Sequence, residues 1–264
     1  MRILFIGDIV GKPGRRAVHE LLPELISSYQ IDFVIANGEN AAAGFGITRE
    51  IVEDLLEGRI DVLTMGNHVW DKKEVLDFIA DYESLIRPAN YPGSAPGRGS
   101  VVMPSIKGYH VGVINLMGRV FMHPLECPFR TAEQEIEKIR KRTKIILVDM
   151  HAEATSEKIA MGWFLDGKVT AVVGTHTHVQ TADDRVLPGG TAYITDVGMT
   201  GPFDSVIGTR KEIVLERFLT QIPNKFDVAK GDVRLQAVLI DVDERSGSAM
   251  SIERLSLPLH QPYG

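Results

Sequence analysis

The sequence has little cysteine and no long apolar run. Cys127 is the only cysteine among the 264 residues, which excludes an internal disulfide and fits a reducing compartment. No stretch of about 18 or more apolar residues is present, so the pattern predicts no membrane span. The N-terminal run "RILFIG" is too short for a secretory signal and lacks a small-residue cleavage site. These absences lead us to expect a cytoplasmic protein.

An excess of positive charge and the common nucleotide-binding motifs are also missing. The formal net charge is −6, so we expect no stable nucleic-acid binding, although a pocket for one small phosphate ester is not excluded. The glycine-rich stretches "GKPGRR" and "AAAGFG" lack the lysine–serine ending of a phosphate-binding loop. No G-x-S-x-G elbow and no dinucleotide fingerprint is present. The remaining composition, 44% hydrophobic and 24% charged, is typical of a globular protein with a full core.

Short apolar runs alternate with segments that have helical periodicity. This alternation predicts one α/β domain, residues 1–264, with helices on both sides of the sheet. The C-terminal part differs, because residues 233–257 read as a hairpin that turns at "ERSGS". We therefore expect mixed central β-sheets rather than a purely parallel sheet. The expected strands are 2–7, 33–38, 61–66, 110–116, 144–150, 169–174, 191–198 and 233–243, and the expected helices are 14–29, 48–58, 72–81 and 131–143.

Two residues allow specific predictions about these helices. Pro23 should kink or break the first helix, because proline has no backbone N–H to donate. Thr48 is a suitable N-cap for the second helix.

The longest irregular stretch, Arg87–Ser100, is rich in proline and glycine. Long loops in compact domains are often functional, so we expect this one to border a substrate entrance.

Five of the expected strands end in residues that can bind a metal or transfer a proton. These are Asp8, Glu39 with Asn40, Asn67 with His68, His151, and His176 with His178. In open α/β sheets, ligands bind outside the carboxyl ends of the strands. Residues scattered over about 170 positions of the sequence are therefore expected to meet at one sheet edge.

Each of these residues has an ordinary structural explanation when it is taken alone. Asp8, Asn40 and Asn67 could be turn or cap residues, and His151 could cap the following segment. His68 could equally be a hydrogen-bonded core histidine. The pair in "GTHTH" is the strongest single feature, because two imidazoles two residues apart point to one side of an extended chain. The remaining histidines, which we interpret as surface or structural residues, are His19, His110, His123 and His260.

The candidate ligands form an oxygen and nitrogen set without sulfur. Such a set suits Mn, Fe, Co, Ni or Zn rather than an iron–sulfur cluster or a closed structural zinc site. There are too many ligands for one tetrahedral ion, whereas two ions could share the carboxylate of Glu39. Two metals about 3.5–4 Å apart can deprotonate a shared water and hold the oxygens of a phosphate ester.

Several motifs resemble those of the calcineurin-like metallophosphoesterases, and in detail those of their YmdB-like subgroup. They are "MRILFIGDIVGKPGR", "NGENAAAGFGIT", "MGNHVWDKKE", "RPANYP", "DMHAEATSEK", "VVGTHTHVQTAD" and "AYITDVGMTGP". The resemblance is strong to about residue 204 and weaker beyond it. The general superfamily has Asp-x-His at the first strand end and an aspartate bridge. This chain has Val10 and Glu39 at those places, and the YmdB-like subgroup shares both departures.

The resemblance implies a fold, a ligand set and a reaction. The fold would be a four-layer αββα sandwich. By resemblance, one metal is held by Asp8, Glu39, Asn40 and His178, and the second by Glu39, Asn67, His151 and His176. A metal-bridging hydroxide would attack phosphorus, and His68 would act as general acid on the leaving oxygen. The two ions would be Fe or Mn, with Zn, Co or Ni as further candidates, and the substrates would include 2′,3′-cyclic nucleotides.

The sequence thus predicts a dinuclear phosphodiesterase that acts on a small phosphodiester, and three alternatives stay open. One is a broad-specificity phosphomonoesterase built on the same site. Another is a metal-loaded regulatory protein with little turnover, against which the intact His68 argues. A third, an RNA-binding module, is disfavoured by the net charge. A homo-oligomer is compatible with the sequence.

Overall fold

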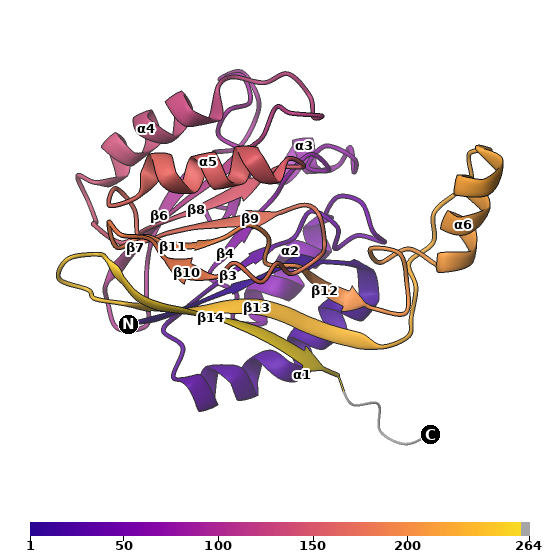
Figure 1. Ribbon diagram of the computed structural model, residues 1–264, viewed down its shortest axis with the longest axis horizontal. Coiled ribbons are helices and arrows are strands. Elements are labelled where there is room, and N and C mark those ends of the chain that lie inside the picture. The colour runs from indigo at the N-terminus through magenta and orange to yellow at the C-terminus, as the bar shows by residue number, and fades with distance from the viewer. Residues whose placement is uncertain (260–264) are drawn as a thin grey trace.

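The computed structural model describes residues 1–259; His260 lies outside them. Within this range the strands form two mixed sheets (Figure 1). The first sheet has the order β2 (Asp8–Ile9), β12 (Met199–Pro202), β13 (Val233–Val242), β1 (Arg2–Ile6), β3 (Phe33–Asn37), β4 (Val62–Thr64) and β5 (Leu85–Ile86), and β14 (Ala249–Pro258) also pairs with β13. The second has the order β10 (Arg185–Val186), β11 (Ala192–Ile194), β9 (Ala171–Thr175), β8 (Ile146–His151), β7 (His110–Met117) and β6 (Ser100–Pro104).

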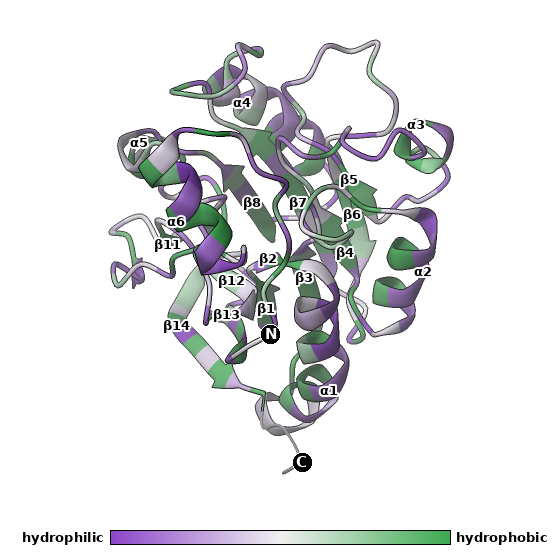
Figure 2. Ribbon diagram, turned by 90° about the vertical axis from the view of Figure 1, so that its right-hand side faces the viewer, coloured by the Kyte–Doolittle hydropathy of each residue, from purple (hydrophilic) through white to green (hydrophobic). Residues whose placement is uncertain are grey.

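The two sheets pack face to face, and helices cover their outer faces. Side chains alternate along each strand, so Ile3 and Phe5 enter the core between the sheets whereas Leu4 and Ile6 face the helices. The helices on the first sheet are α1 (Gly11–Tyr29) and α2 (Arg49–Glu57), and those on the second are α4 (Pro128–Ile139) and α5 (Thr155–Leu165). Figure 2 shows mainly hydrophobic strands between helices of mixed hydropathy. The mixed α/β architecture, with four layers, is confirmed.

Parallel pairing places several strand ends on the same edge. Strands β1, β3, β4 and β5 run parallel, as do β7, β8, β9 and β11. The predicted C-terminal hairpin is confirmed, because β13 and β14 pair antiparallel. The expectation of a single sheet edge needs correction: the five strand ends belong to two sheets whose edges meet.

Two helix predictions differ from the structure: the break at Pro23 and the length of the third helix. The first helix continues through Pro23 to Tyr29 without a break. Pro23 lies on the exposed side of the helix, where water can hydrate the His19 carbonyl that the proline leaves without a partner. The helix expected over residues 72–81 is reduced to α3 (Val75–Phe78), because neighbouring N–H groups donate to carbonyls three residues back, as in a tighter 3₁₀ turn.

The predicted helix cap is confirmed, and the structure contains two helices that were not predicted. The Thr48 hydroxyl caps α2 by accepting a hydrogen bond from the Ile51 N–H. Helix α5 and a further helix, α6 (Lys211–Thr220), were not among the expected elements. Helix α6 projects from the body of the molecule on an extended arm (Figure 1). Among residues 1–259, no helix combines the length and apolar character that crossing a membrane requires.

Candidate metal centre

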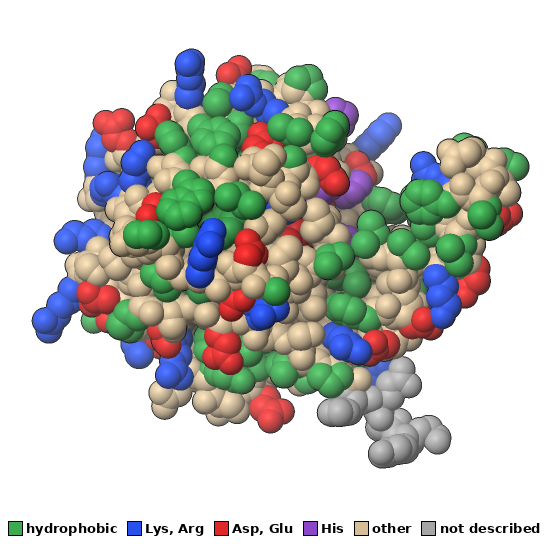
Figure 3. All heavy atoms as spheres, viewed as in Figure 1, with side chains coloured by type: hydrophobic (Ala, Val, Ile, Leu, Met, Phe, Trp, Pro, Cys, Tyr) green, Lys and Arg blue, Asp and Glu red, His purple; other side chains and the backbone are tan. Residues whose placement is uncertain are grey.

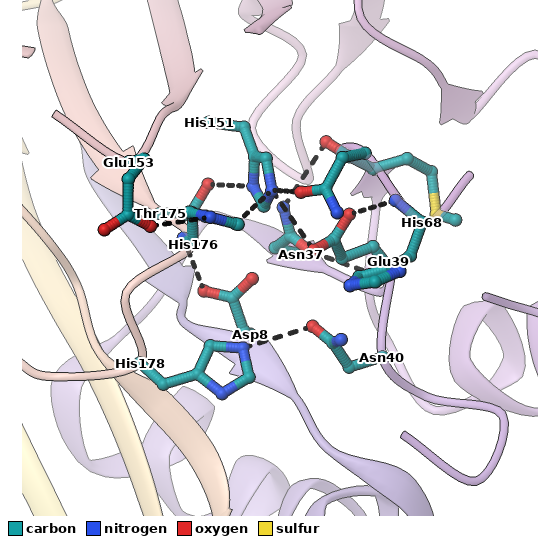
Figure 4. A network of polar contacts seen from close by, with 12 residues as sticks. Asp8, Asn37, Glu39, Asn40, His68, His151, Glu153, Thr175, His176 and His178 are labelled. Atoms are coloured by element: carbon teal, nitrogen blue, oxygen red, sulfur yellow. Dashed lines mark hydrogen bonds and ion pairs between the residues drawn. The ribbon is translucent and has the colours of Figure 1, made fainter. Parts of the chain in front are cut away.

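The seven candidate ligands lie together where the edges of the two sheets meet: Figure 4 labels six of them, and the seventh, Asn67, contacts His151. Two groups can be distinguished by their contacts. In the first group, His151 Nε2 lies 2.9 Å from Asn67 Oδ1, 3.1 Å from Glu39 Oε1 and 3.1 Å from His176 Nδ1. Ligand atoms of Glu39, His151 and His176 all lie within 4.8 Å of one another. Four side chains from both sheets thus surround one point.

The second group lies next to the first and contains Asp8, Asn40 and His178. The His178 Nδ1–H donates to the Ile207 carbonyl at 2.9 Å, so Nε2 is the nitrogen that faces Asn40 Oδ1, at 3.3 Å. Asp8 Oδ2 accepts a hydrogen bond from the His176 backbone N–H at 3.2 Å. The hydrogen bond of Asp8 thus goes to the first group, and Figure 4 shows its carboxylate between His176 and His178.

A buried hydrogen-bond relay orients the ring of His151. The Thr175 hydroxyl donates to Asp149 Oδ1 at 2.7 Å, so it accepts from the His151 Nδ1–H at 2.9 Å. Asp149 also accepts from the side chains of Asn37 and Thr64. Because Nδ1 donates to Thr175, Nε2 is the ring nitrogen that points into the group of ligands. This arrangement, a carboxylate behind a histidine, is the one that commonly orients metal-binding imidazoles.

The "HTH" segment is a strained turn rather than an extended chain. His176 has φ 101° and His178 has φ 63°, values in the region that L-residues rarely adopt. The expected extended conformation is therefore wrong: His176 turns toward His151 and His178 turns toward Asn40, although both line the same cavity. Asp196 holds the turn by accepting from the N–H and the hydroxyl of Thr177, at 3.0 and 2.8 Å.

The carboxylates favour positive charge inside the centre. Burial lowers the pKa of His151, but the charges of Glu39 and Asp8 outweigh it and raise this pKa to about 9. Burial likewise raises the pKa of Glu39, but the charge and hydrogen bond of His151 lower it to about 2. Burial and the charge of His151 both lower the pKa of His176, to about 3. The buried acids thus favour a positive charge at the point where the first group meets.

These side chains fit a metal site. Asp8 Oδ1 is buried and has no hydrogen-bond partner among the described residues. A buried carboxylate oxygen without a partner is costly unless a cation satisfies it. The donors are carboxylate, amide and imidazole groups, which transition-metal ions bind well. The group of Glu39, His151 and His176 is consistent with a metal site.

His68 lies beside the ligands without joining either group. Its backbone N–H donates to Glu39 Oε2 at 2.9 Å, and its Nδ1 lies 2.7 Å from Asp71 Oδ2. Nε2 is therefore the ring nitrogen left for a substrate. The ring of Phe45 packs edge-on against His68, with centroids 5.0 Å apart. Asp71 was not among the predicted residues, although its spacing three positions after His68 could have indicated it.

A cavity of about 580 Å³ opens onto this centre. Glu39, Asn40, His68, His176 and His178 line its polar end. Its opposite wall is formed by α6 and the arm that carries it, and Figure 3 shows the hollow between α6 and the body of the molecule. The volume lies within the range of small-ligand pockets.

The proline-rich loop 87–100 does not line this cavity. The guanidinium of the buried Arg87 donates to the carbonyls of Pro88, Ala95 and Pro96, so the loop folds around its own arginine. Tyr91 packs edge-on against Trp70, two residues beyond His68. The loop thus packs behind the segment that carries His68 and does not border the cavity, contrary to our expectation. The arm around α6 borders the cavity instead.

Comparison with known proteins shows to which family the chain belongs. The model of the YmdB-like protein family matches residues 4–255. A Bacillus subtilis protein named 2′,3′-cyclic-nucleotide 2′-phosphodiesterase is 53% identical over 97% of this chain and 96% of its own length. A crystal structure of a hypothetical protein from Thermus thermophilus has 43% identity and a TM-score of 0.91, over 98% and 99% of the two chains. That of a novel phosphatase from Mycoplasma pneumoniae has 38% identity and a TM-score of 0.90, over 98% and 93%. The chain belongs to the YmdB-like protein family.

Proposed function

We propose that this protein is a metal-dependent phosphodiesterase that opens 2′,3′-cyclic nucleotides. The observation that carries the proposal is that ligand-type side chains from both sheets converge at the end of a ligand-sized cavity, beside the buried Oδ1 of Asp8, which has no hydrogen-bond partner among residues 1–259. The substrate is suggested by the name of the B. subtilis relative, which is 53% identical over nearly the whole chain.

Two transition-metal ions, Fe or Mn in the first instance, would use the ligands in their two groups. Asp8, Asn40 and His178 would hold one ion, and Asn67, His151 and His176 the other, with the carboxylate of Glu39 shared. Bound there, such ions supply Lewis-acid stabilisation of phosphoryl oxygens and lower the pKa of water. Because both sheets contribute ligands, we also propose that residues 1–264 act as one domain.

His68 would provide the proton for the leaving group. Hydrolysis adds water across one P–O bond of the cyclic ester: a new P–O bond forms, the P–O2′ bond breaks, and O2′ takes up a proton. Since Nδ1 of His68 is engaged by Asp71, the proton for O2′ would come from Nε2. Asp71 would stabilise the imidazolium and hold the ring in place, as the aspartate of a hydrolase triad does.

The experiment compares leaving groups at constant metal content. His68→Ala should retain its metals and lose about 10²–10⁴ in kcat with 2′,3′-cyclic AMP, because general acid catalysis contributes about that much. The loss should be smaller with bis-p-nitrophenyl phosphate, since nitrophenolate leaves without protonation. His123→Ala, which removes an exposed histidine, is the matched control.

Two outcomes would contradict the proposal. Equal losses on both esters at full metal content would remove His68 from proton transfer. Faster hydrolysis of phosphomonoesters than of any diester by the wild-type protein would favour the phosphatase alternative, which the description of the M. pneumoniae structure also suggests.

A further inference from the structure

A second cavity adjoins the first, and several basic side chains line it beside apolar ones. It has a volume of about 860 Å³, and its basic lining residues are Lys12, Arg16, Lys72, Lys225 and Lys230. One acidic residue, Asp227, is among the described residues that line it. Five basic side chains against one acidic side chain leave an excess of four positive charges, in a chain whose formal net charge is −6. Positive charge is thus concentrated at this cavity, although the chain as a whole is acidic.

Within residues 1–259, four of these five cations form no ion pair and are available to bind an anion. The ion pairs that lysines form within residues 1–259 involve Lys107, Lys138, Lys158, Lys168 and Lys211, and none of the lysines of the basic cavity. Arg16 differs, because its guanidinium pairs with Glu20 at 2.6 Å. The four lysines come from α1, from the turn before α3 and from the arm after α6, so the fold has gathered them from distant parts of the chain.

The two cavities share an apolar wall. Phe45, Phe226 and Val228 line both of them. Phe45 is presented by the "GFG" sequence, in which Gly44 and Gly46 have φ of 94° and 73°. A Cβ atom on Gly46 would lie 2.9 Å from Lys72 Cγ, so glycine allows Lys72 to approach the loop. Aromatic side chains beside cations form the usual platform for single-stranded nucleic acid, on which bases stack.

We infer that the substrate, for the phosphodiesterase proposed above, is the 3′ end of an RNA strand that carries a 2′,3′-cyclic phosphate. The cyclic phosphate lies at the metal centre, and the phosphodiesters upstream of it lie in the basic cavity. In such an end the chain continues from the 5′ oxygen, on the other side of the ribose from the cyclic phosphate. A free mononucleotide would occupy the first cavity and leave the lysines without a phosphate.

The charge distribution limits this contact to a few nucleotides. The acidic net charge argues against an extended nucleic-acid surface. The basic cavity has room for a few nucleotides next to the metal centre. Ends of this type arise when a ribose 2′-hydroxyl attacks the neighbouring phosphodiester and breaks the strand. RNA cleavage by this route would therefore supply the substrate, and the product is a strand that ends in a 3′-phosphate.

The test compares 2′,3′-cyclic AMP with a tri-adenylate that ends in a 2′,3′-cyclic phosphate. In the metal-loaded wild-type protein, we expect kcat/KM to be about tenfold or more higher for the trinucleotide. The double variant Lys12→Gln/Lys72→Gln should lose most of that advantage and hydrolyse 2′,3′-cyclic AMP within about twofold of the wild-type rate. Lys141→Gln, which removes an exposed lysine just beyond α4, in the helix layer of the second sheet, is the matched control.

Salt provides an independent readout. Two phosphate contacts on a single strand give a slope of about −1.4 in a plot of log kcat/KM against log salt, and the slope for 2′,3′-cyclic AMP should be shallower. The inference is overturned if the wild-type protein hydrolyses both substrates equally well, or if the double variant slows both to the same extent. Failure to hydrolyse 2′,3′-cyclic AMP at all would instead overturn the proposed function.

Discussion

Gly66 is the position where one added methyl group should damage the metal centre. A Cβ atom there would lie 2.3 Å from His151 Nε2 and Cδ2, and 2.4 Å from Glu39 Oε2, whereas ordinary contacts begin at 3.4 Å. In Gly66→Ala the two side chains must therefore shift by about 1 Å. Both are almost completely buried, with exposed fractions of 0% and 1%, so they have little room to move away. Metal sites tolerate changes in ligand distance of only about 0.2 Å.

We expect Gly66→Ala to fold and to lose metal and activity. The overpacking should cost about 1–3 kcal/mol of unfolding free energy, which a domain of this size can tolerate. A displacement of about 1 Å at a reacting centre should reduce kcat about 10²-fold or more. The assays are elemental analysis after metal loading and desalting, and turnover of 2′,3′-cyclic AMP.

Gly93→Ala is the matched control, because no atom lies within 4 Å of a Cβ built at that residue. It should bind metal and turn over substrate like the wild-type protein. If Gly66→Ala kept two metal ions per chain and full activity, Glu39 and His151 could not be the ligands that we propose.

Two further predictions concern stability. Lys158 and Asp196 are both 0% exposed and pair at 2.7 Å beneath the "HTH" turn; Lys158→Met should lower the unfolding free energy by about 3–5 kcal/mol in urea titrations, because a buried carboxylate loses its counter-charge. An unchanged urea midpoint would show that the hydrogen bonds from Thr177 and Gly198 suffice for Asp196. Pro23→Ala should raise the melting temperature by restoring a donor to the His19 carbonyl, for a gain of about 1–3 kcal/mol; a lower melting temperature would contradict our account of α1.

Local pattern was sufficient for most of the strands and for the identity of the candidate ligands. Apolar runs of five or six residues, followed by glycine and then by Asp, Glu, Asn or His, indicate where strands end and which side chains come next. The hairpin of β13 and β14 and the cap at Thr48 were also predictable, because turns and caps depend on neighbouring residues. Helix α5 was missed because its buried residues include the polar Lys158, which disrupts the apolar pattern.

Supporting residues were harder to predict than candidate ligands. Asp149 lies inside an apolar strand, and this exception to the pattern was the only local signal that it carries a special role. Its function behind His151 depends on Thr175, which belongs to a different strand. Asp196 resembles many other aspartates in sequence, and its contact with Thr177 exists only because the chain turns back on itself.

The sequence by itself therefore determined the elements, the order of the strand ends and the chemical nature of the donors, because these depend on short-range burial and turn preferences. The tertiary structure alone decided that the strand ends come from two packed sheets, that the two histidines of "HTH" diverge, and that Lys12 and Lys225 border one cavity. The physical reason is that contacts between residues distant in the chain depend on how whole layers pack, and no local pattern records that packing.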